Sequence, residues 1–328
     1  SGKGHDHQNI YDLFKKAQIS NAPCLLNFKT TIGFGSPNKS AKASSHGSPL
    51  GSDEVNLTRS KLSWSEKPFQ IPEKLLKIWR GSADKNKKLY KKSKSTFHSN
   101  LSKKDIDKLF NKIELDLKNF NSDQATRKSS EAILNYIEGD HPILGGSADL
   151  TGSNNTKGKE MSVMNSKNMS GQYIHYGVRE HGMAAIMNGI AATKIYKTYS
   201  GTFLSFADYM KPSLRLAALM KIDPIQVFTH DSIGLGEDGP THQPIEQINM
   251  LRLIPNSYVF RPCDLKETIV CWKEALKIDN APSFICLSRQ NLPQISNKKL
   301  VSKNFKGAYV ISGPNKNNDI TIIATGSE

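Results

Sequence analysis

Residues 224–242 read Pro224-Ile-Gln-Val-Phe-Thr-His-Asp-Ser-Ile-Gly-Leu-Gly-Glu-Asp-Gly-Pro-Thr-His242. The first five residues predict a short buried strand, and the polar loop after them leads into a helix predicted at 244–253. The same alternation of strand and helix recurs on both sides of this stretch, which predicts an α/β fold with a doubly wound parallel sheet. Ligands of such sheets bind outside the carboxyl ends of the strands, where the polar motifs fall here. Strands are predicted at 142–144, 258–260 and 283–287, and helices at 125–137, 178–192, 203–220 and 264–276.

The segments before and after this region read differently. A helix is predicted at 9–19, a short strand at 24–28, and a helix start at Ser52. From Pro68 to about Ser122 the sequence is rich in lysine, helical in pattern and weakly hydrophobic, which indicates a long connection between domains. After Leu300 two further strands are predicted, at 308–311 and 320–324.

Composition excludes several classes of protein. The chain has 328 residues, of which 37% are hydrophobic, enough for a packed core in two or three domains. No apolar run reaches the roughly 18 residues that a membrane span needs, and the first residues are not a signal peptide. The four cysteines form no C-x-x-C pair, so we expect no zinc site and predict reduced thiols of an intracellular protein.

The formal net charge is +15, and the excess lies mainly between Lys74 and Lys128. One interpretation is a nucleic-acid surface. The other is a solvated, lysine-rich linker face, which we favour because aromatic residues are not interleaved at stacking spacing. In either case a positive field attracts anionic substrates.

The loop after the strand at 224–228 concentrates His230, Asp238 and His242, groups that accept, donate and orient protons. Three other interpretations stay open. Gly234, Gly236 and Gly239 match a dinucleotide fingerprint literally, although Pro240 and His242 crowd the helix start. His230, Asp231, Asp238 and His242 could hold a metal, although their spacing is not standard. The loop could also be a polar turn with satisfied histidines.

Three further signals each have a structural and a functional interpretation. Glu180, in Tyr176-Gly-Val-Arg-Glu-His-Gly-Met183, either complements a helix dipole or is a carboxylic acid that stays neutral in an apolar setting. Phe203, Phe206 and Tyr209 share one side of a helix as core residues or as a cradle for a ring. Arg289 follows a strand as a surface ion pair or as a phosphate ligand.

Taken together, these segments resemble the transketolase family, in the same order across nearly the whole chain. The matching strings are Thr30-Thr-Ile-Gly-Phe-Gly-Ser36, His46-Gly-Ser-Pro-Leu50, Gly145-Gly-Ser-Ala-Asp-Leu150, Tyr176–Met183, His230–Pro244, Ser288-Arg-Gln-Asn-Leu-Pro293 and Ala324-Thr-Gly-Ser327.

The resemblance implies a thiamin-diphosphate-binding fold truncated at both ends. Residues 1–122 match the C-terminal part of the diphosphate-binding domain plus the linker, 123–300 the pyrimidine-binding domain, and 301–328 the start of the C-terminal domain. The family's diphosphate and metal motif is expected upstream of Ser1, so ligands for magnesium or calcium are not expected in this chain, and the chain alone is expected to be inactive. Residues 41–45 depart from the family, where many relatives carry an additional histidine.

The resemblance also implies roles for individual residues. Glu180 would bond the aminopyrimidine ring of thiamine diphosphate, and Phe206, flanked by Phe203 and Tyr209, would cradle that ring. Asp149 and His46 would also lie against the cofactor. The catalytic set would be Glu180, His46, His230 and His242, and the sugar phosphate would contact Arg127, Ser153, His230, Asp238, His242 and Arg289.

The activity implied is transfer of a two-carbon ketol unit from a ketose phosphate such as xylulose 5-phosphate to an aldose phosphate such as ribose 5-phosphate, in the pentose phosphate pathway of carbohydrate metabolism. The expected partner is a second copy in a cytoplasmic homodimer with the active site at the interface, without nucleic acid or membrane. The alternatives are another thiamine diphosphate enzyme, such as deoxyxylulose-phosphate synthase, or a non-catalytic transketolase-like binding protein.

Overall fold

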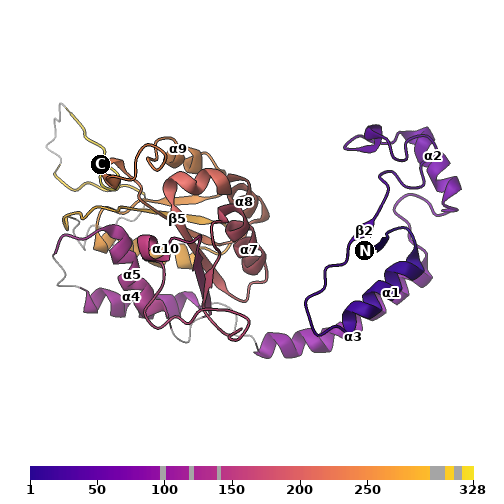
Figure 1. The fold of residues 1–328 in the computed structure, drawn as a ribbon, viewed down its shortest axis with the longest axis horizontal. Coiled ribbons are helices and arrows are strands. Elements are labelled where there is room, and N and C mark those ends of the chain that lie inside the picture. The colour runs from indigo at the N-terminus through magenta and orange to yellow at the C-terminus, as the bar shows by residue number, and fades with distance from the viewer. Residues whose placement is uncertain (97–100, 118–121, 139–141, 296–306, 314–319) are drawn as a thin grey trace. The chain divides into compact units, whose positions relative to one another are not determined.

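The computed structural model describes residues 1–96, 101–117, 122–138, 142–295, 307–313 and 320–328, without the side chains at 85, 88 and 92–96. Part of the lysine-rich stretch predicted as a linker face, including Lys85, Lys88, Lys92 and Lys94, therefore lies outside the described side chains. The chain forms two compact units, residues 1–90 and 91–328 (Figure 1). Each unit is described by itself.

The first unit is built around one pair of short parallel strands. Strand β1 (Gly2–Lys3) pairs with β2 (Phe28–Lys29), and α1 (His7–Gln18) packs beside them, its N-terminus capped by the Asp6 side chain. The strand predicted at 24–28 is thus wrong except at its last residue. A strand requires a partner ladder, and β1 offers only two residues for pairing.

The remainder of this unit contains η1 (Ala43–Ser45), α2 (Ser52–Lys61) and most of α3 (Glu73–Thr96). The predicted helix start at Ser52 is confirmed. Glu54 in the first turn of α2 accepts hydrogen bonds from the Ser36 hydroxyl and from the backbone and side-chain amides of Asn38. These bonds fix the loop at 33–38 against α2.

The second unit contains a six-stranded sheet in which every neighbouring pair is parallel, so the α/β class with a parallel sheet is confirmed. Sequence analysis missed two strands, β4 and β5. The β5 sequence, Lys197-Thr-Tyr-Ser-Gly-Thr-Phe203, is mostly polar and contains a glycine, so it lacks the apolar run of a buried strand. The strands in spatial order are β4 (Tyr173–His175), β3 (Ile143–Ser147), β5 (Lys197–Phe203), β6 (Ile225–Thr229), β8 (Ser283–Leu287) and β7 (Tyr258–Phe260).

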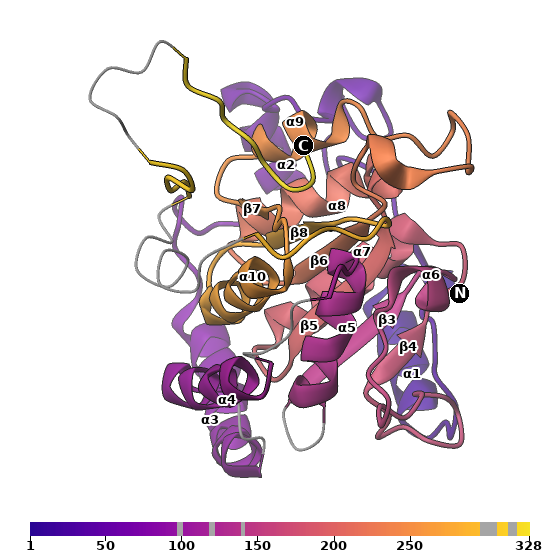
Figure 2. The same cartoon turned by 90° about the vertical axis from the view of Figure 1, so that its left-hand side faces the viewer.

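Helices cover both faces of this sheet, as doubly wound folds require (Figure 2). On one face lie α4 (Lys103–Asp116), α5 (Thr126–Ile137) and α10 (Leu265–Lys277). On the other lie α7 (Glu180–Ala192), α8 (Ala207–Met220) and α9 (Gln247–Arg252). Short elements α6 (Thr151–Asn154), η2 (Leu204–Phe206) and η3 (Ile233–Leu235) follow β3, β5 and β6.

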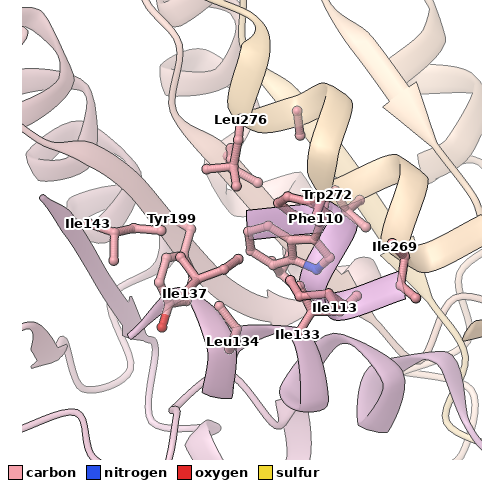
Figure 3. Close-up of a cluster of buried hydrophobic side chains, with 14 of the residues drawn as sticks. Phe110, Ile113, Ile133, Leu134, Ile137, Ile143, Tyr199, Ile269, Trp272 and Leu276 are labelled. Carbon is pink, nitrogen blue, oxygen red and sulfur yellow. The ribbon is translucent and has the colours of Figure 1, made fainter. Parts of the chain in front are cut away.

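The core beneath α5 and α10 centres on Trp272, whose ring meets Tyr199 edge-on at 5.8 Å (Figure 3). The indole N–H donates to the Ser130 hydroxyl at 2.9 Å, so this buried donor is satisfied. Helix α4 adds Phe110 and Ile113 to the same cluster. The segment predicted as a weakly hydrophobic connection therefore supplies a helix of the core, because its apolar residues recur at helical spacing on one face.

The end of the chain also differs from expectation. Within 307–313 and 320–328 no strand forms, so the strands predicted at 308–311 and 320–324 are wrong there. Ile320, Ile322 and Ile323 are more than three-quarters exposed, because none of the described strands pairs with this apolar run. Among the described residues, no helix is long and apolar enough to cross a membrane.

Candidate active site

Parallel pairing brings the carboxyl ends of four strands to one edge of the sheet. Phe203, Thr229 and Leu287 lie level with one another across β5, β6 and β8. The residues that follow these strand ends, and the end of β3, include most of the residues that sequence analysis predicted as functional. The structure thus gathers them at one edge, as the topology predicts.

Aromatic and imidazole rings form the centre of this edge. The Phe203 ring lies 3.8 Å from the His230 ring, 5.7 Å from the Phe206 ring and 5.8 Å from the His242 ring, centroid to centroid. Phe206 also meets His242 at 5.2 Å and Tyr209 at 6.0 Å. Phe203, Phe206 and Tyr209 were expected on one side of a single helix. They lie instead at the end of β5, in η2 and in α8, yet each ring still lies against the next.

His230 is buried and holds an unusual backbone conformation, with φ of 59°. Its Nδ1 lies 2.9 Å from the Thr229 hydroxyl, which itself donates to the Asn154 Oδ1 at 2.7 Å. Because that hydroxyl has only one proton to donate, Nδ1 of His230 must carry the proton in their contact. The network therefore leaves Nε2 of His230 as an acceptor.

The charge state of His230 follows from its surroundings. Burial first, and then the positive charges of Arg127 and Arg289 together with His242, lower the pKa of His230 to about 3. The ring is neutral at physiological pH. It is thus a weak base but a well-positioned hydrogen-bond acceptor for a hydroxyl group.

Two arginines bring positive charge to the same edge. Arg127 donates from Nη1 to the Ser153 carbonyl, while its buried Nε has no partner among the described residues. Burial, and secondly the charge of Arg289, lower the pKa of Arg127, whereas Glu131 and Asp238 act in the opposite sense. Two guanidinium groups that repel each other in this way favour a multiply charged anion between them.

Reciprocal hydrogen bonds between the buried residues Thr126 and Ser288 position this arginine pair. The Thr126 amide donates to the Ser288 hydroxyl at 3.0 Å, and the Ser288 amide donates to the Thr126 hydroxyl at 2.7 Å. Arg127 and Arg289 are the next residues in each segment. The exposed Glu237 carboxylate accepts from Arg289 at 3.1 Å, and its exposure makes this ion pair easy to replace.

Glu180 is the first residue of α7 and is 9% exposed. Among the described residues, no hydrogen bond or ion pair engages its carboxyl group. Arg179 turns back to donate to the Tyr176 carbonyl at 2.8 Å instead of pairing with Glu180. A carboxyl group that has no protein partner at this edge is available to a ligand.

The other predicted residues have different surroundings. Asp149 follows β3 with a left-handed φ of 64° and is exposed, as are Ser153 and Asp238. His46 ends η1 in the first unit and is exposed, and nothing in the structure relates it to His230. Its predicted place in the site stays a prediction.

The geometry weighs against two of the alternatives for the His230–His242 loop. Gly234 and Gly236 lie in and directly after η3, and the next helix begins only at Gln247, so the dinucleotide fingerprint does not open a helix. Asp231 is paired with Arg261 at 2.8 Å. Among the described residues, no group of three or more His, Cys, Asp or Glu side chains is placed to hold a metal ion.

Sequence analysis missed the residues that position the site: Asn154, Thr229, Thr126 and Ser288. Each is a small polar residue whose role depends on a partner distant in sequence, for example the 75 positions between Asn154 and Thr229. The only local signal is that such residues adjoin strand ends.

Residues 122–294 match the model of the transketolase pyrimidine binding domain. The chain belongs to the transketolase family. Residues 1–114 match the model of the transketolase thiamine diphosphate binding domain, which supports thiamine diphosphate as the cofactor.

Transketolases of known sequence and structure resemble this chain over almost all of its length. The chain is 44% identical to transketolase 2 of Escherichia coli and 42% identical to the transketolase of Buchnera aphidicola, with 99% of this chain and 51–52% of each relative covered. The Campylobacter jejuni transketolase structure superposes with a TM-score of 0.76 at 40% identity, over 90% of this chain and 47% of that one. A Pichia stipitis transketolase complex with sedoheptulose 7-phosphate gives 0.80 at 37%, over 95% and 49%. The chain thus spans about half the length of these relatives.

Proposed function

We propose that the protein carrying this chain is a transketolase, which transfers a two-carbon ketol unit between sugar phosphates with thiamine diphosphate and a divalent metal. The observation that carries the proposal is the convergence of the His230–Phe203–Phe206–His242 rings with the Arg127–Arg289 pair in a chain of this family. Aromatic rings, and groups that accept hydrogen bonds from hydroxyls, suit a sugar. Paired guanidinium groups suit its phosphate.

The described residues fit the aminopyrimidine end of the cofactor. Glu180 offers a carboxyl group without a partner among the described residues, and the rings of Phe203, Phe206 and Tyr209 range from buried to exposed. When bound, thiamine diphosphate stabilises the negative charge that develops as the C2–C3 bond of a ketose breaks. Asp149 and His46 belong to the same proposed cofactor contacts.

The residues of this chain would perform the remaining tasks. Glu180 shares a proton with a ring nitrogen of the cofactor and thereby sets its protonation state. His230 accepts from a substrate hydroxyl through Nε2, and His242 and His46 move protons at neighbouring hydroxyls. Asp238 accepts from a further substrate hydroxyl, and Arg127, Ser153 and Arg289 hold the phosphate.

The wider context is proposed in the same way. Residues 1–122 would form the C-terminal part of the diphosphate-binding domain plus the linker. Residues 123–300 would form the pyrimidine-binding domain, and 301–328 the start of the C-terminal domain. A homodimer is supported by the exposed apolar residues of α7 and α8, and a cytoplasmic location by free cysteines. The exposed apolar residues are Ile186, Leu216, Leu219 and Met220.

The test at the phosphate site compares Arg289→Ala with wild type in the complete protein, with phosphorylated and free aldose acceptors. We expect kcat/KM for the phosphorylated acceptor to fall by at least about a hundredfold, since a charge-assisted pair to phosphate is lost, and that for the free aldose to fall much less. Exposed Arg252→Lys is the control. Equal losses on both acceptors would remove Arg289 from the phosphate site, and product from pyruvate as donor would instead favour a deoxyxylulose-phosphate synthase.

A further inference from the structure

Arg261, directly after β7, is a buried cation outside the proposed substrate contacts. Its side chain is 7% exposed. The guanidinium donates from Nε to the Asp231 carboxylate at 2.8 Å and from Nη2 to the Asp231 carbonyl at 3.1 Å. Arg261 therefore fixes both the side chain and the backbone of the residue next to His230.

The same guanidinium engages the end of the chain. Nη1 donates to the Thr325 carbonyl at 3.3 Å, and Nη2 pairs with Glu328 at 2.9 Å. The other Glu328 oxygen accepts from the Ile233 amide at 3.3 Å. Two backbone bonds between Thr325 and Glu328 close this segment into a turn.

Gly326 in this turn shows how closely the two parts fit. Its φ is 61°, and a Cβ built there would lie 2.8 Å from the Arg261 side chain. A larger residue would therefore be strained in its backbone and crowded against the guanidinium. The turn thus packs on Arg261 as well as bonding to it.

The His230 backbone needs such support. A left-handed conformation at a residue other than glycine costs free energy and persists only where the surroundings hold it. The Thr229 hydroxyl holds the His230 ring on one side, and the Asp231 amide donates to the Leu287 carbonyl at 3.3 Å. Without Arg261, the buried Asp231 carboxylate, whose Oδ1 already lacks a partner, would have no compensating charge.

We propose that Arg261 is a positioning residue, which clamps the His230–Asp231 turn to the Thr325–Glu328 segment and so keeps the His230 ring against Phe203. The segment after residue 324 thereby becomes part of the support of the active site. The positioning of His230 by Arg261 does not depend on the proposed function, whereas its effect on catalysis rests on that function.

The test follows the His230 ring in the 328-residue chain by NMR titration of labelled histidine, with His230→Gln identifying the signal. In wild type we expect a midpoint of about 3, because burial and the neighbouring Arg127, Arg289 and His242 lower the pKa of the ring. Arg261→Lys keeps the positive charge but loses the planar guanidinium that bonds two groups at once, so the His230–Asp231 turn relaxes. Water then reaches the His230 ring, and the titration midpoint of the ring rises by at least about one pH unit. Glu328→Gln, at a half-exposed position, gives a smaller rise in the same direction.

Arg252→Lys, an exposed arginine at the end of α9, is the matched control and leaves the titration unchanged. The proposal is overturned if both Arg261→Lys and Glu328→Gln fold and neither shifts the His230 midpoint. If Arg261→Lys does not fold, Glu328→Gln alone decides: a rise supports the proposal and no change overturns it.

A second readout in the complete protein separates the two proposals. Arg261→Lys lowers kcat for ketol transfer about tenfold with little change in KM, because the ring is misplaced while the phosphate contacts stay. If wild type shows no ketol transfer, the proposed function fails, and the titration still decides the role of Arg261. If wild type is active and kcat of Arg261→Lys is unchanged, the catalytic consequence is overturned.

Discussion

At the scale of single residues, the site combines the neutral His230 imidazole and phenylalanine rings with two guanidinium groups. His230 is kept neutral by burial and by nearby arginines, and the acceptor Nε2 is assigned by the Thr229–Asn154 chain of hydrogen bonds. Glu180 shows the opposite arrangement, a nearly buried acid without a partner among the described residues. Both features suit the ligands of the proposed function, which bring hydroxyls, a ring nitrogen and a phosphate.

The buried neutral His230 predicts a specific pH dependence of stability. Its pKa is about 3 in the folded chain and 6.5 ordinarily, so between these values the unfolded chain binds the proton and the folded chain does not. The stabilisation is therefore complete above pH 6.5 and is lost as the pH falls toward 3. Between pH 7 and 5 we expect wild type to lose about 2 kcal/mol more unfolding free energy than His230→Gln in urea titrations. Identical pH slopes for the two proteins would contradict this assignment.

Candidate functional residues could be predicted from the sequence only where they belong to a local motif. The positions of His230 and His242 after a strand were predicted, whereas Phe203 and Phe206 were predicted on a helix and lie at the end of β5 and in η2. The structure brings these four rings together. Asn154 and Ser288 could not be predicted, because their hydrogen-bond partners lie far away in sequence. The place of His46 stays a prediction, since it belongs to the other unit.

At the scale of elements, apolar periodicity predicted the helices better than the strands. Helices α5 and α10 were found to within one residue because each has a continuous apolar face. Strand β5 was missed because its inward residues include Thr198, Ser200 and Thr202, which are buried without being apolar. The terminal apolar run at 320–324 was overpredicted, because a strand depends on a partner that periodicity does not reveal.

The docking of α4 gives a prediction at this scale. Phe110 is fully buried between α4 and the Trp272 cluster, so Phe110→Ala should cost about 3–5 kcal/mol of unfolding free energy by leaving a cavity (Figure 3). Leu115→Ala, on the exposed side of the same helix, should change it by less than about 0.5 kcal/mol. Urea denaturation monitored by tryptophan fluorescence measures both. Similar losses for the two variants would mean that α4 is a connection rather than part of the core.

At the scale of the whole molecule, the proposed function makes the chain one edge of a larger site. Its described residues supply rings, acceptors and arginines, while the family resemblance assigns the diphosphate and metal contacts to sequence outside it. The exposed apolar face of α7 and α8 is consistent with a site that is completed by a second copy.

This face predicts the effect of a charge on assembly. Leu219 is 69% exposed on α8, and Leu219→Asp should shift the complete protein from dimer to monomer, because a carboxylate at an apolar interface must be desolvated. Leu115→Asp, at a similarly exposed leucine of α4, should leave the dimer intact. Sedimentation at several concentrations distinguishes the two. A dimer unaffected by Leu219→Asp would place the interface elsewhere.

The central claim is that Glu180 serves the cofactor of a ketol transferase, and one assay tests it most directly. The complete protein is incubated with xylulose 5-phosphate, ribose 5-phosphate and magnesium, with and without thiamine diphosphate, as wild type and as Glu180→Ala. We predict sedoheptulose 7-phosphate only from wild type with cofactor, and a loss far beyond tenfold, or about 1.4 kcal/mol, in the variant. Activity of Glu180→Ala within tenfold of wild type, or no product from wild type at saturating cofactor, would contradict the account.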